Sequence, residues 1–204
     1  YENGVCKDCS NIWKTTIDDI TYQTVTKEEN GKPAGQTVTV TVDGQNVEML
    51  AVAVTAVDVN ALSQNNSDIF ANGTLTIPAK VIDDDAKQTC VVTRINSDVF
   101  VQDTEAPVIS EVVIPDTVTV IQESAFAECT NLSQIHLSDN LEYMYDSAFG
   151  YCNSLNNVCI PKTLVECYSK DFFKGEGGPF RDCINLKNIS FEEGITNIPK
   201  KLFY

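Results

Sequence analysis

SEVVIPDTVTVIQESAFAECTNL (Ser110–Leu132) and SQIHLSDNLEYMYDSAFGYCNSL (Ser133–Leu155) follow each other in this chain, and each is 23 residues long. A third copy covers Asn156–Leu186 and contains eight extra residues, Ser169–Glu176. A fourth copy starts at Lys187 and runs to Tyr204. Self-similarity with a period in the twenties is the sequence signature of a stacked repeat. The chain is therefore predicted to form a solenoid.

Apolar side chains recur at the third, fifth, ninth and twelfth positions of each copy. They are Val112, Ile114, Val118 and Ile121; Ile135, Leu137, Leu141 and Met144; Val158, Ile160, Leu164 and Cys167; Ile189, Phe191, Ile195 and Ile198. The third and fifth positions alternate with polar neighbours, which is the period of a half-buried strand. Pro115 and Pro161 follow and cannot donate to a sheet, so they should end that strand.

Further along each copy come a phenylalanine, a cysteine and a leucine. These are Phe126, Phe149 and Phe180; Cys129, Cys152 and Cys183; Leu132, Leu155 and Leu186. One coil cannot bury these residues alone, but coils stacked at the ~4.8 Å spacing of paired strands cover one another.

The order IPxxVxxIxxxAFxxCxxL resembles the BspA-like leucine-rich repeat family, found mostly in surface proteins of host-associated bacteria and in some parasitic protists. The resemblance covers roughly Gly73–Tyr204. It implies a β-rich solenoid of the α+β class, a right-handed leucine-rich repeat stack with 23-residue coils. It also implies adhesion to host extracellular-matrix proteins or to other microbes. Four features depart from the pattern and affect the local shape of the coils. They are the segments Val81–Thr89 and Ser169–Glu176, Cys167 in an isoleucine column, and Asp103 at a position where cysteine is usual.

The repeats divide the chain into two predicted parts. Residues 69–204 form the solenoid, with coils near 73–109, 110–132, 133–155, 156–186 and 187–204, the last one incomplete. We expect the natural protein to continue beyond Tyr204. Residues 1–68 are predicted to form an N-terminal β cap, because solenoid ends need a polar cover. A small independent adhesion module of sandwich type is the alternative.

The first part contains strand signals rather than repeats. Ile20–Thr26 and Gln36–Val42 alternate Thr with Val or Tyr, which predicts a hairpin around the polar residues between them. Asp43-Gly44 predicts a second turn. The valine density of Val47–Val59 favours a strand over a helix, and the polar Ser63–Asp68 leads into the repeats.

Composition limits the function classes. With 14 basic and 29 acidic residues the net charge is −15, which disfavours nucleic acid as a partner. The sequence contains no run of 18 apolar residues, the length that a membrane-spanning helix needs. Its first residues do not have the basic start and apolar stretch of an export signal. We expect an exported protein, extracellular or on a cell surface. Asp83-Asp84-Asp85 lacks the spacing of a calcium loop, so a solvated loop is favoured over a calcium site.

Eight cysteines invite a chemical role. Those of the repeat column and Cys167 are predicted to be small apolar filler, and Cys90 could be either buried or reactive. Cys6 and Cys9 have redox or zinc spacing but no second pair, so a local disulfide or two free thiols is favoured. No cofactor or metal is predicted.

A recognition surface is predicted on the outward strand positions of successive coils. The candidates are Glu111, Val113, Gln134, His136, Asn157, Cys159, Asn188 and Ser190, with Tyr143, Tyr145 and Tyr168 beside them. The tyrosines could instead cover the edge of the core. The inserted loop with Phe172 and Phe173 is a second candidate. The partner would be a protein or a glycan on a host or microbial surface.

Two alternatives belong to other classes. Stacking should place the Cα atoms of His136 and Cys159 ~5 Å apart, which supplies a thiolate nucleophile and its base, with Asn157 on the same face. A flat sheet without a pocket or an oxyanion hole speaks against catalysis. In the other alternative, the repeats are a spacer for a domain beyond Tyr204.

Overall fold

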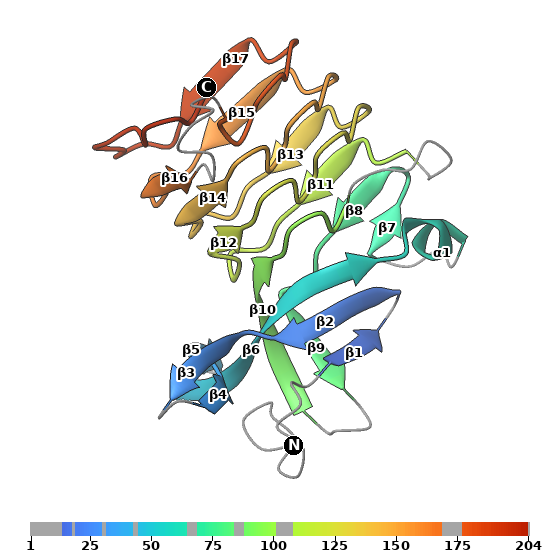
Figure 1. The fold of residues 1–204 in the computed structure, drawn as a ribbon, viewed down its shortest axis with the longest axis vertical. Coiled ribbons are helices and arrows are strands. Elements are labelled where there is room, and N and C mark those ends of the chain that lie inside the picture. The colour runs from blue at the N-terminus through green and yellow to red at the C-terminus, as the bar shows by residue number, and fades with distance from the viewer. Residues whose placement is uncertain are drawn as a thin grey trace.

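The computed structural model describes residues 14–17, 19–29, 32–42, 45–64, 69–83, 88–100, 108–168 and 177–203. This part of the chain is rich in strands, with a single short helix, α1 (Val59–Gln64). In Figure 1 the repeats form the upper body, and the N-terminal strands form the lower body. The β-rich character predicted from the sequence is confirmed.

The first three copies contribute two short strands each, and the last copy contributes one described strand. The strands are β11 (Glu111–Val113) and β12 (Val120–Ile121); β13 (Gln134–His136) and β14 (Tyr143–Tyr145); β15 (Asn157–Ile160) and β16 (Glu166–Tyr168); and β17 (Asn188–Phe191). Equivalent strands pair in parallel, with Val112 opposite Ile135 and Met144 opposite Cys167. Before them, β8 (Thr74–Thr76) pairs in parallel with β11, and β7 (Phe70–Ala71) pairs with β8. The apolar columns therefore meet between β12, β14 and β16 on one side and β11, β13, β15 and β17 on the other.

Most predicted core positions are buried. Val118, Leu141 and Leu164, for example, are all at most 3% exposed. The prediction is wrong for the last coil, where Ile189 is 39% and Ile198 is 55% exposed. Among the described residues no strand pairs with the outer edge of β17, so these two side chains are covered only in part. As predicted, β15 ends immediately before Pro161.

A phenylalanine stack runs through the centre of the repeats. Phe100, Phe126, Phe149, Phe180 and Phe203 follow one another with ring centroids 4.6, 5.1, 5.6 and 6.0 Å apart. The rings are nearly parallel in the first two pairs, with interplanar angles of 1° and 2°. Aromatic side chains bury more area than any others and gain further from ring contact. This stack therefore forms the centre of the repeat core.

The chain turns at corners on either side of each phenylalanine through left-handed residues that are not glycine. Asp98, Ser124 and Ser147 stand two residues before a phenylalanine, and Glu128 and Tyr151 two residues after one, with φ between 53° and 62°. Such backbone costs roughly 1–2 kcal/mol for an L-residue. Hydrogen bonds offset the cost, because each corner N–H donates to a carbonyl of the following coil, at 2.8 Å for Glu128 and 2.9 Å for Tyr151.

The N-terminal strands form around one long strand, β6 (Gln45–Val57). The others are β1 (Lys14–Ile17), β2 (Ile20–Thr24), β3 (Thr26–Glu29), β4 (Lys32–Gly35), β5 (Thr37–Val42), β9 (Lys80–Asp83) and β10 (Gln88–Ile95). The predicted hairpin between Ile20–Thr26 and Gln36–Val42 is wrong. Instead β2 and β5 both pair with β6, on successive stretches of it, and the polar segment between them forms its own hairpin, β3–β4.

The predicted strand at Val47–Val59 is confirmed, since β6 covers most of it and α1 starts at Val59. Of the polar stretch Ser63–Asp68, the first two residues end α1. Asp43 and Gly44 lie outside the described residues, although the register places Val42 opposite Gln45.

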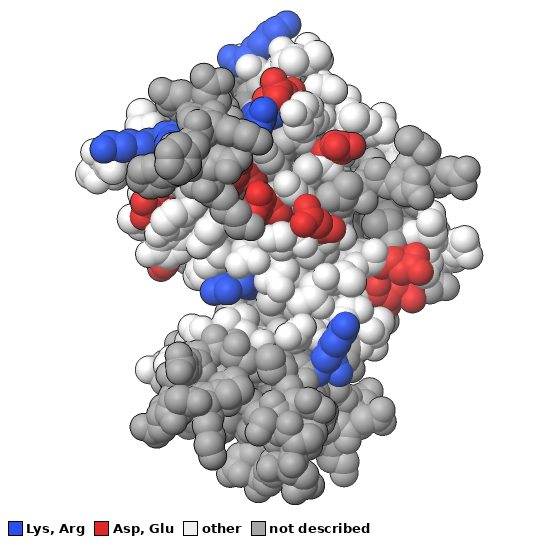
Figure 2. Space-filling model, in the orientation of Figure 1, with Lys and Arg blue, Asp and Glu red and all other residues white. Residues whose placement is uncertain are grey.

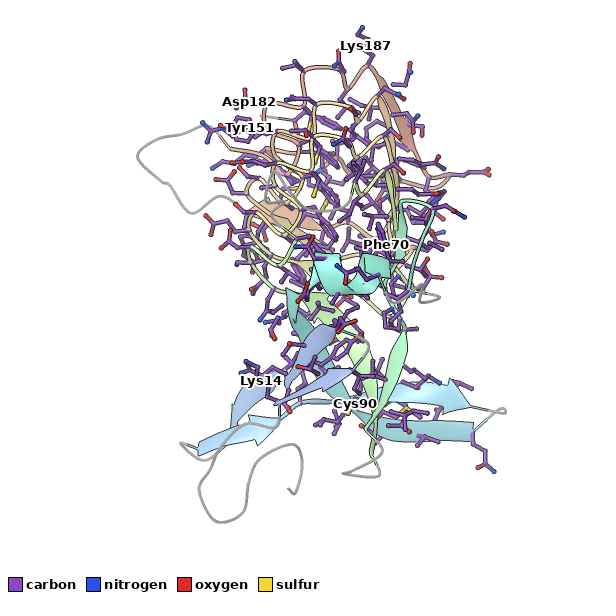
Figure 3. The ribbon with its side chains drawn as sticks, turned by 90° about the vertical axis from the view of Figure 1, so that its right-hand side faces the viewer. Lys14, Phe70, Cys90, Tyr151, Asp182 and Lys187 are labelled. Atoms are coloured by element: carbon purple, nitrogen blue, oxygen red, sulfur yellow. The ribbon has the colours of Figure 1, made fainter. Side chains whose placement is uncertain are left out.

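One sheet joins the N-terminal strands to the repeats. β6 pairs in parallel with β10, which pairs with β12, and the order continues through β14 to β16. Leu50, Val54 and Ile95 belong to the same buried cluster as Phe126 and Leu155. Figure 3 shows Lys14 and Cys90 in the lower body and Lys187 at the opposite end of the molecule. The two parts therefore share a hydrophobic core.

Candidate binding surfaces

The structure places the eight strand candidates on the outward face of β11, β13, β15 and β17. In register, Glu111 lies opposite Gln134 and Val113 opposite His136. Likewise Asn157 lies opposite Asn188, and Cys159 opposite Ser190. Apart from the half-buried Glu111 and Val113, all eight are exposed. This surface is called the strand face below.

His136 is held by the preceding coil. Its Nε2 lies 2.9 Å from Oε1 of Glu111 and 2.8 Å from Nε2 of Gln134. Thr74 donates to the other oxygen of Glu111 at 2.8 Å. The hydrogen bond from Thr74, and to a smaller extent the one with His136, lower the pKa of Glu111. The carboxylate therefore stays charged at neutral pH, and it orients the imidazole.

The strand face is interrupted between β13 and β15. These two strands run side by side in Figure 1, yet among the described strands neither hydrogen-bonds to the other. His136 and Cys159 therefore lie on strands that share no ladder, and among the described residues the hydrogen bonds of the imidazole go to Gln134 and Glu111. The imidazole is engaged with Glu111 instead of the thiol.

Two open hollows lie across this interruption, so the strand face is not flat there. Both are lined by Ile135, His136 and Cys159. The first, about 430 Å³, also has acidic groups from Asp116 and Glu192. The second, about 540 Å³, has amides from the strand positions of three coils. Its polar residues are Gln134, Asn157, Lys187, Asn188 and Ser190.

The tyrosines belong to a different surface. Tyr143 and Tyr145 lie on β14 and Tyr168 on β16, in the nine-stranded sheet and not on the strand face. Their rings contact one another, with centroids 4.8 Å apart for Tyr145 and Tyr168 and 6.0 Å for Tyr143 and Tyr168. A hydrogen bond to Glu166 raises the pKa of Tyr168. The structure does not bring them together with the other candidates.

The column cysteines are buried, as predicted, and they also hydrogen-bond. The thiols of Cys129, Cys152 and Cys183 donate to the carbonyl oxygens of Phe100, Phe126 and Phe149 at 3.2, 3.3 and 3.0 Å. Each thiol thus links its coil to the phenylalanine of the coil before.

The remaining cysteines divide by exposure. Cys90 and Cys167 are buried, whereas Cys159 is exposed. Burial raises the pKa of Cys129 to about 12 and that of Cys167 to about 12.

We expect the six described cysteines to differ sharply in alkylation. Pulse labelling of the native protein with iodoacetamide near pH 8 should modify Cys159 within minutes. Cys90, Cys129, Cys152, Cys167 and Cys183 should react only after unfolding, because all five thiols are buried and out of reach of the reagent. The raised pKa values of Cys129, Cys152 and Cys167 also keep these three thiols protonated, and the thiolate is the nucleophile. Peptide mass spectrometry with and without denaturant gives the comparison, and rapid native labelling of the column cysteines would contradict the buried ladder.

Several sequence candidates lie outside the described residues. These are Cys6 and Cys9, Asp84 and Asp85, Asp103 and the inserted loop Ser169–Glu176. Within the described ranges no group of three or more His, Cys, Asp or Glu residues is placed to bind a metal ion. The acidic residues of the first hollow, Asp116 and Glu192, were not predicted from the sequence. Asp116 follows Pro115 at a fixed place in the repeat, which could have identified it.

On the face drawn in Figure 2, Asp and Glu side chains are spread across the upper body, together with Lys and Arg side chains. The net charge of the whole chain is −15. Among the described residues, no helix is both long enough and apolar enough to span a membrane.

Comparisons with known proteins agree with the repeat pattern. The model of the BspA type leucine rich repeat region matches residues 93–204 in 6 copies. No curated protein matches the chain. A leucine-rich repeat protein from Bacteroides capillosus is 24% identical, with a TM-score of 0.60 over 88% of this chain and 98% of that chain.

Two further solved structures share the fold. The pneumococcal vaccine antigen PcpA is 20% identical, with a TM-score of 0.58 over 88% of this chain and 38% of that chain. A leucine rich cell surface protein from Faecalibacterium prausnitzii is 18% identical, with a TM-score of 0.52 over 95% of this chain and 46% of that chain. This chain thus spans less than half the length of these two relatives.

Proposed function

Because the chain belongs to the BspA-type leucine-rich repeat family, we propose that it is a non-catalytic binding protein that works outside the cell or on its surface. Its 23-residue coils form a right-handed stack, and residues 1–68 cover one end of that stack. The strand face holds a protein or a glycan of a host or microbial surface. One relative of the same fold is a cell surface protein and another is a vaccine antigen, which supports an exposed location.

The observation that carries the proposal is the second hollow. Gln134, Asn157 and Asn188 place amides from three successive coils around a space of about 540 Å³. An amide both donates and accepts hydrogen bonds, so this row can pair with hydroxyl groups of a sugar or with the polypeptide backbone. Outward strand positions can also vary without disturbing the core, which is how repeat proteins build binding surfaces.

The geometry around Cys159 favours binding over catalysis. A cysteine nucleophile needs a base within hydrogen-bond reach. His136 is directed by Glu111 at 2.9 Å, and no ladder of the described strands brings β13 and β15 together. The hollows are also open depressions rather than closed cavities, so they would not exclude water from a reaction.

The test uses a panel of immobilised extracellular-matrix proteins and a glycan array. We expect the wild-type chain to bind at least one of these. The triple variant Gln134→Ala, Asn157→Ala, Asn188→Ala should bind that target at least tenfold more weakly, because about 1 kcal/mol per lost hydrogen bond adds up over three sites. The matched control is Lys200→Ala, an exposed residue away from the hollow. Equal binding by the triple variant and the wild type would remove the strand face from the proposal.

A further inference from the structure

A groove of about 350 Å³ lies on the other sheet, between the N-terminal strands and the first coils. One wall is β5, with Val38 and Val40. The other comprises Val91 and Arg94 of β10, Val120 of β12, and the turn before β12. The remaining lining residues are Val25, Gln36, Thr39, Thr41, Thr93, Asp116, Thr117 and Thr119. Nearly all are valine or threonine, so the groove is apolar with hydroxyl groups along it.

A small buried cluster lies against one wall of the groove. β6 pairs with β5 along residues 45–50 and with β10 along residues 50–54, the stretch that contains Ala51 and Ala53. These alanines form a small buried cluster with Val25, and Val38 packs against it. Val25 and Val38 line the groove as well, so the cluster holds this wall in place. The groove is therefore part of the folded sheet and not a gap left by a loop.

β5 presents an edge that lacks the usual protection. Among the described strands it pairs only with β6, which occupies one of its two edges. Its sequence, Thr37–Val42, reads TVTVTV and has no charge and no proline. Natural edge strands are normally blunted by lysine, proline or a bulge, because an open edge recruits another strand. Consecutive residues of β5 line the groove, Val38 to Thr41, so the groove runs along the strand's backbone as well as over its valines.

Arg94 provides the charge of the groove. It lies opposite Ala53 and Val120 in the register, and no carboxylate of the described residues forms an ion pair with it. The groove's acidic residue, Asp116, accepts the backbone N–H of Asp139 at 2.9 Å. In a chain of net charge −15, a guanidinium that has no ion pair with a described carboxylate and lies beside an apolar groove is complementary to the carboxylate of a ligand. Arg binds carboxylates in a bidentate geometry.

We propose that this groove binds an extended strand of a partner protein. The strand pairs with the free edge of β5, places small or branched aliphatic side chains along the valines, and brings a carboxylate to Arg94. Addition of a strand to an open edge is an established mode of peptide recognition, in which backbone hydrogen bonds give affinity and alternate side chains give specificity. The site lies on a different sheet from the strand face, so it stands independently of the function proposed above.

The probe is a synthetic peptide of alternating valine and threonine with glutamate at one end, made soluble by a polyethylene-glycol tag. A twin ends in lysine, and a second twin has N-methyl groups on alternate backbone nitrogens. Isothermal titration calorimetry should show binding of the glutamate peptide, with at least tenfold weaker binding of both twins. Arg94→Glu should lower the affinity for the glutamate peptide at least tenfold and raise the affinity for the lysine peptide. Val40→Lys, which fills the groove, should lower the affinity for both peptides.

The matched control is Lys200→Glu, which makes the same change in net charge on an exposed residue of the last coil. It should bind the glutamate peptide as the wild type does, and all variants should show the wild-type circular dichroism spectrum. Three results would overturn the proposal. These are equal binding by Arg94→Glu and the wild type, binding of decanoate in the groove without peptide binding, and dimerisation of the chain through β5 that Val40→Lys abolishes.

Discussion

Replacing Phe126 by alanine should lower the free energy of unfolding by about 3–5 kcal/mol, the usual cost of truncating a fully buried phenylalanine. Phe126 is 0% exposed. It stacks on Phe100 at 4.6 Å and on Phe149 at 5.1 Å, so the substitution removes two ring contacts together with the buried area. For a chain of this size the melting temperature should fall by about 6–20 °C. Thermal unfolding followed by circular dichroism measures the effect.

Phe203→Ala is the matched control for this substitution. Phe203 ends the same stack, contacts only Phe180 among the described rings, at 6.0 Å, and is 42% exposed. The same truncation there should cost far less, since less apolar area returns to water. Similar losses at the two positions would show that the stack does not carry the stability of the repeats.

Val54→Asp should be comparably severe and should affect both halves of the molecule. Val54 is 0% exposed, and it lies opposite Tyr22 on β2 and Ile95 on β10. A carboxylate left without a partner there should cost about 3–5 kcal/mol. Because protonation removes the charge, the deficit should shrink as the pH falls toward about 4. Hydrogen exchange should show lost protection in β2 and also in β12 and β14, since these strands share one sheet and one core.

The control is Ala56→Asp, the same substitution two residues along β6 at an exposed position. It should change stability by less than about 0.5 kcal/mol. If Val54→Asp loosened the N-terminal strands while β12 and β14 kept their protection, the two parts would be separate cooperative units.

The repeat core could be predicted from sequence because the signal is periodic. Val118, Leu141 and Leu164 occupy one column, and all three are buried. Each copy faces the same environment, so several copies report the same structural constraint. The last coil breaks this rule, as Ile198 shows, because burial depends on a neighbour and not on the residue itself.

The pairing of the N-terminal strands could not be read in the same way. Alternation of Thr and Val identifies β2 and β5 as strands, but it does not specify their partners. β6 is long enough to pair with both, and a polar segment such as Thr26–Gly35 can form its own hairpin when its neighbours are occupied. Partner choice is a property of the whole sheet.

The candidate site was predicted in part. The outward residues of β11, β13, β15 and β17 could be assigned to one face by the alternation of side chains along a strand. The tyrosines are aromatic and follow the strand residues in the sequence, but positions eleven and thirteen of the second and third copies belong to the other sheet, as Tyr143 and Tyr145 show. The hollows beside Cys159 depend on the missing ladder between β13 and β15, which no periodicity reveals.

The left-handed corners bear on how such a protein can change its length over generations. Serine, glutamate and tyrosine all occupy these corners, at Ser147, Glu128 and Tyr151, because bonds from the adjoining coil, and not glycine, impose the conformation. A coil gained by duplication would supply carbonyl acceptors for the corner N–H groups of the preceding coil. Its own corner N–H groups would donate to carbonyls of the following coil. Gene recombination can therefore lengthen or shorten the array without a new solution for the main chain, and selection is left free to act on the exposed side chains.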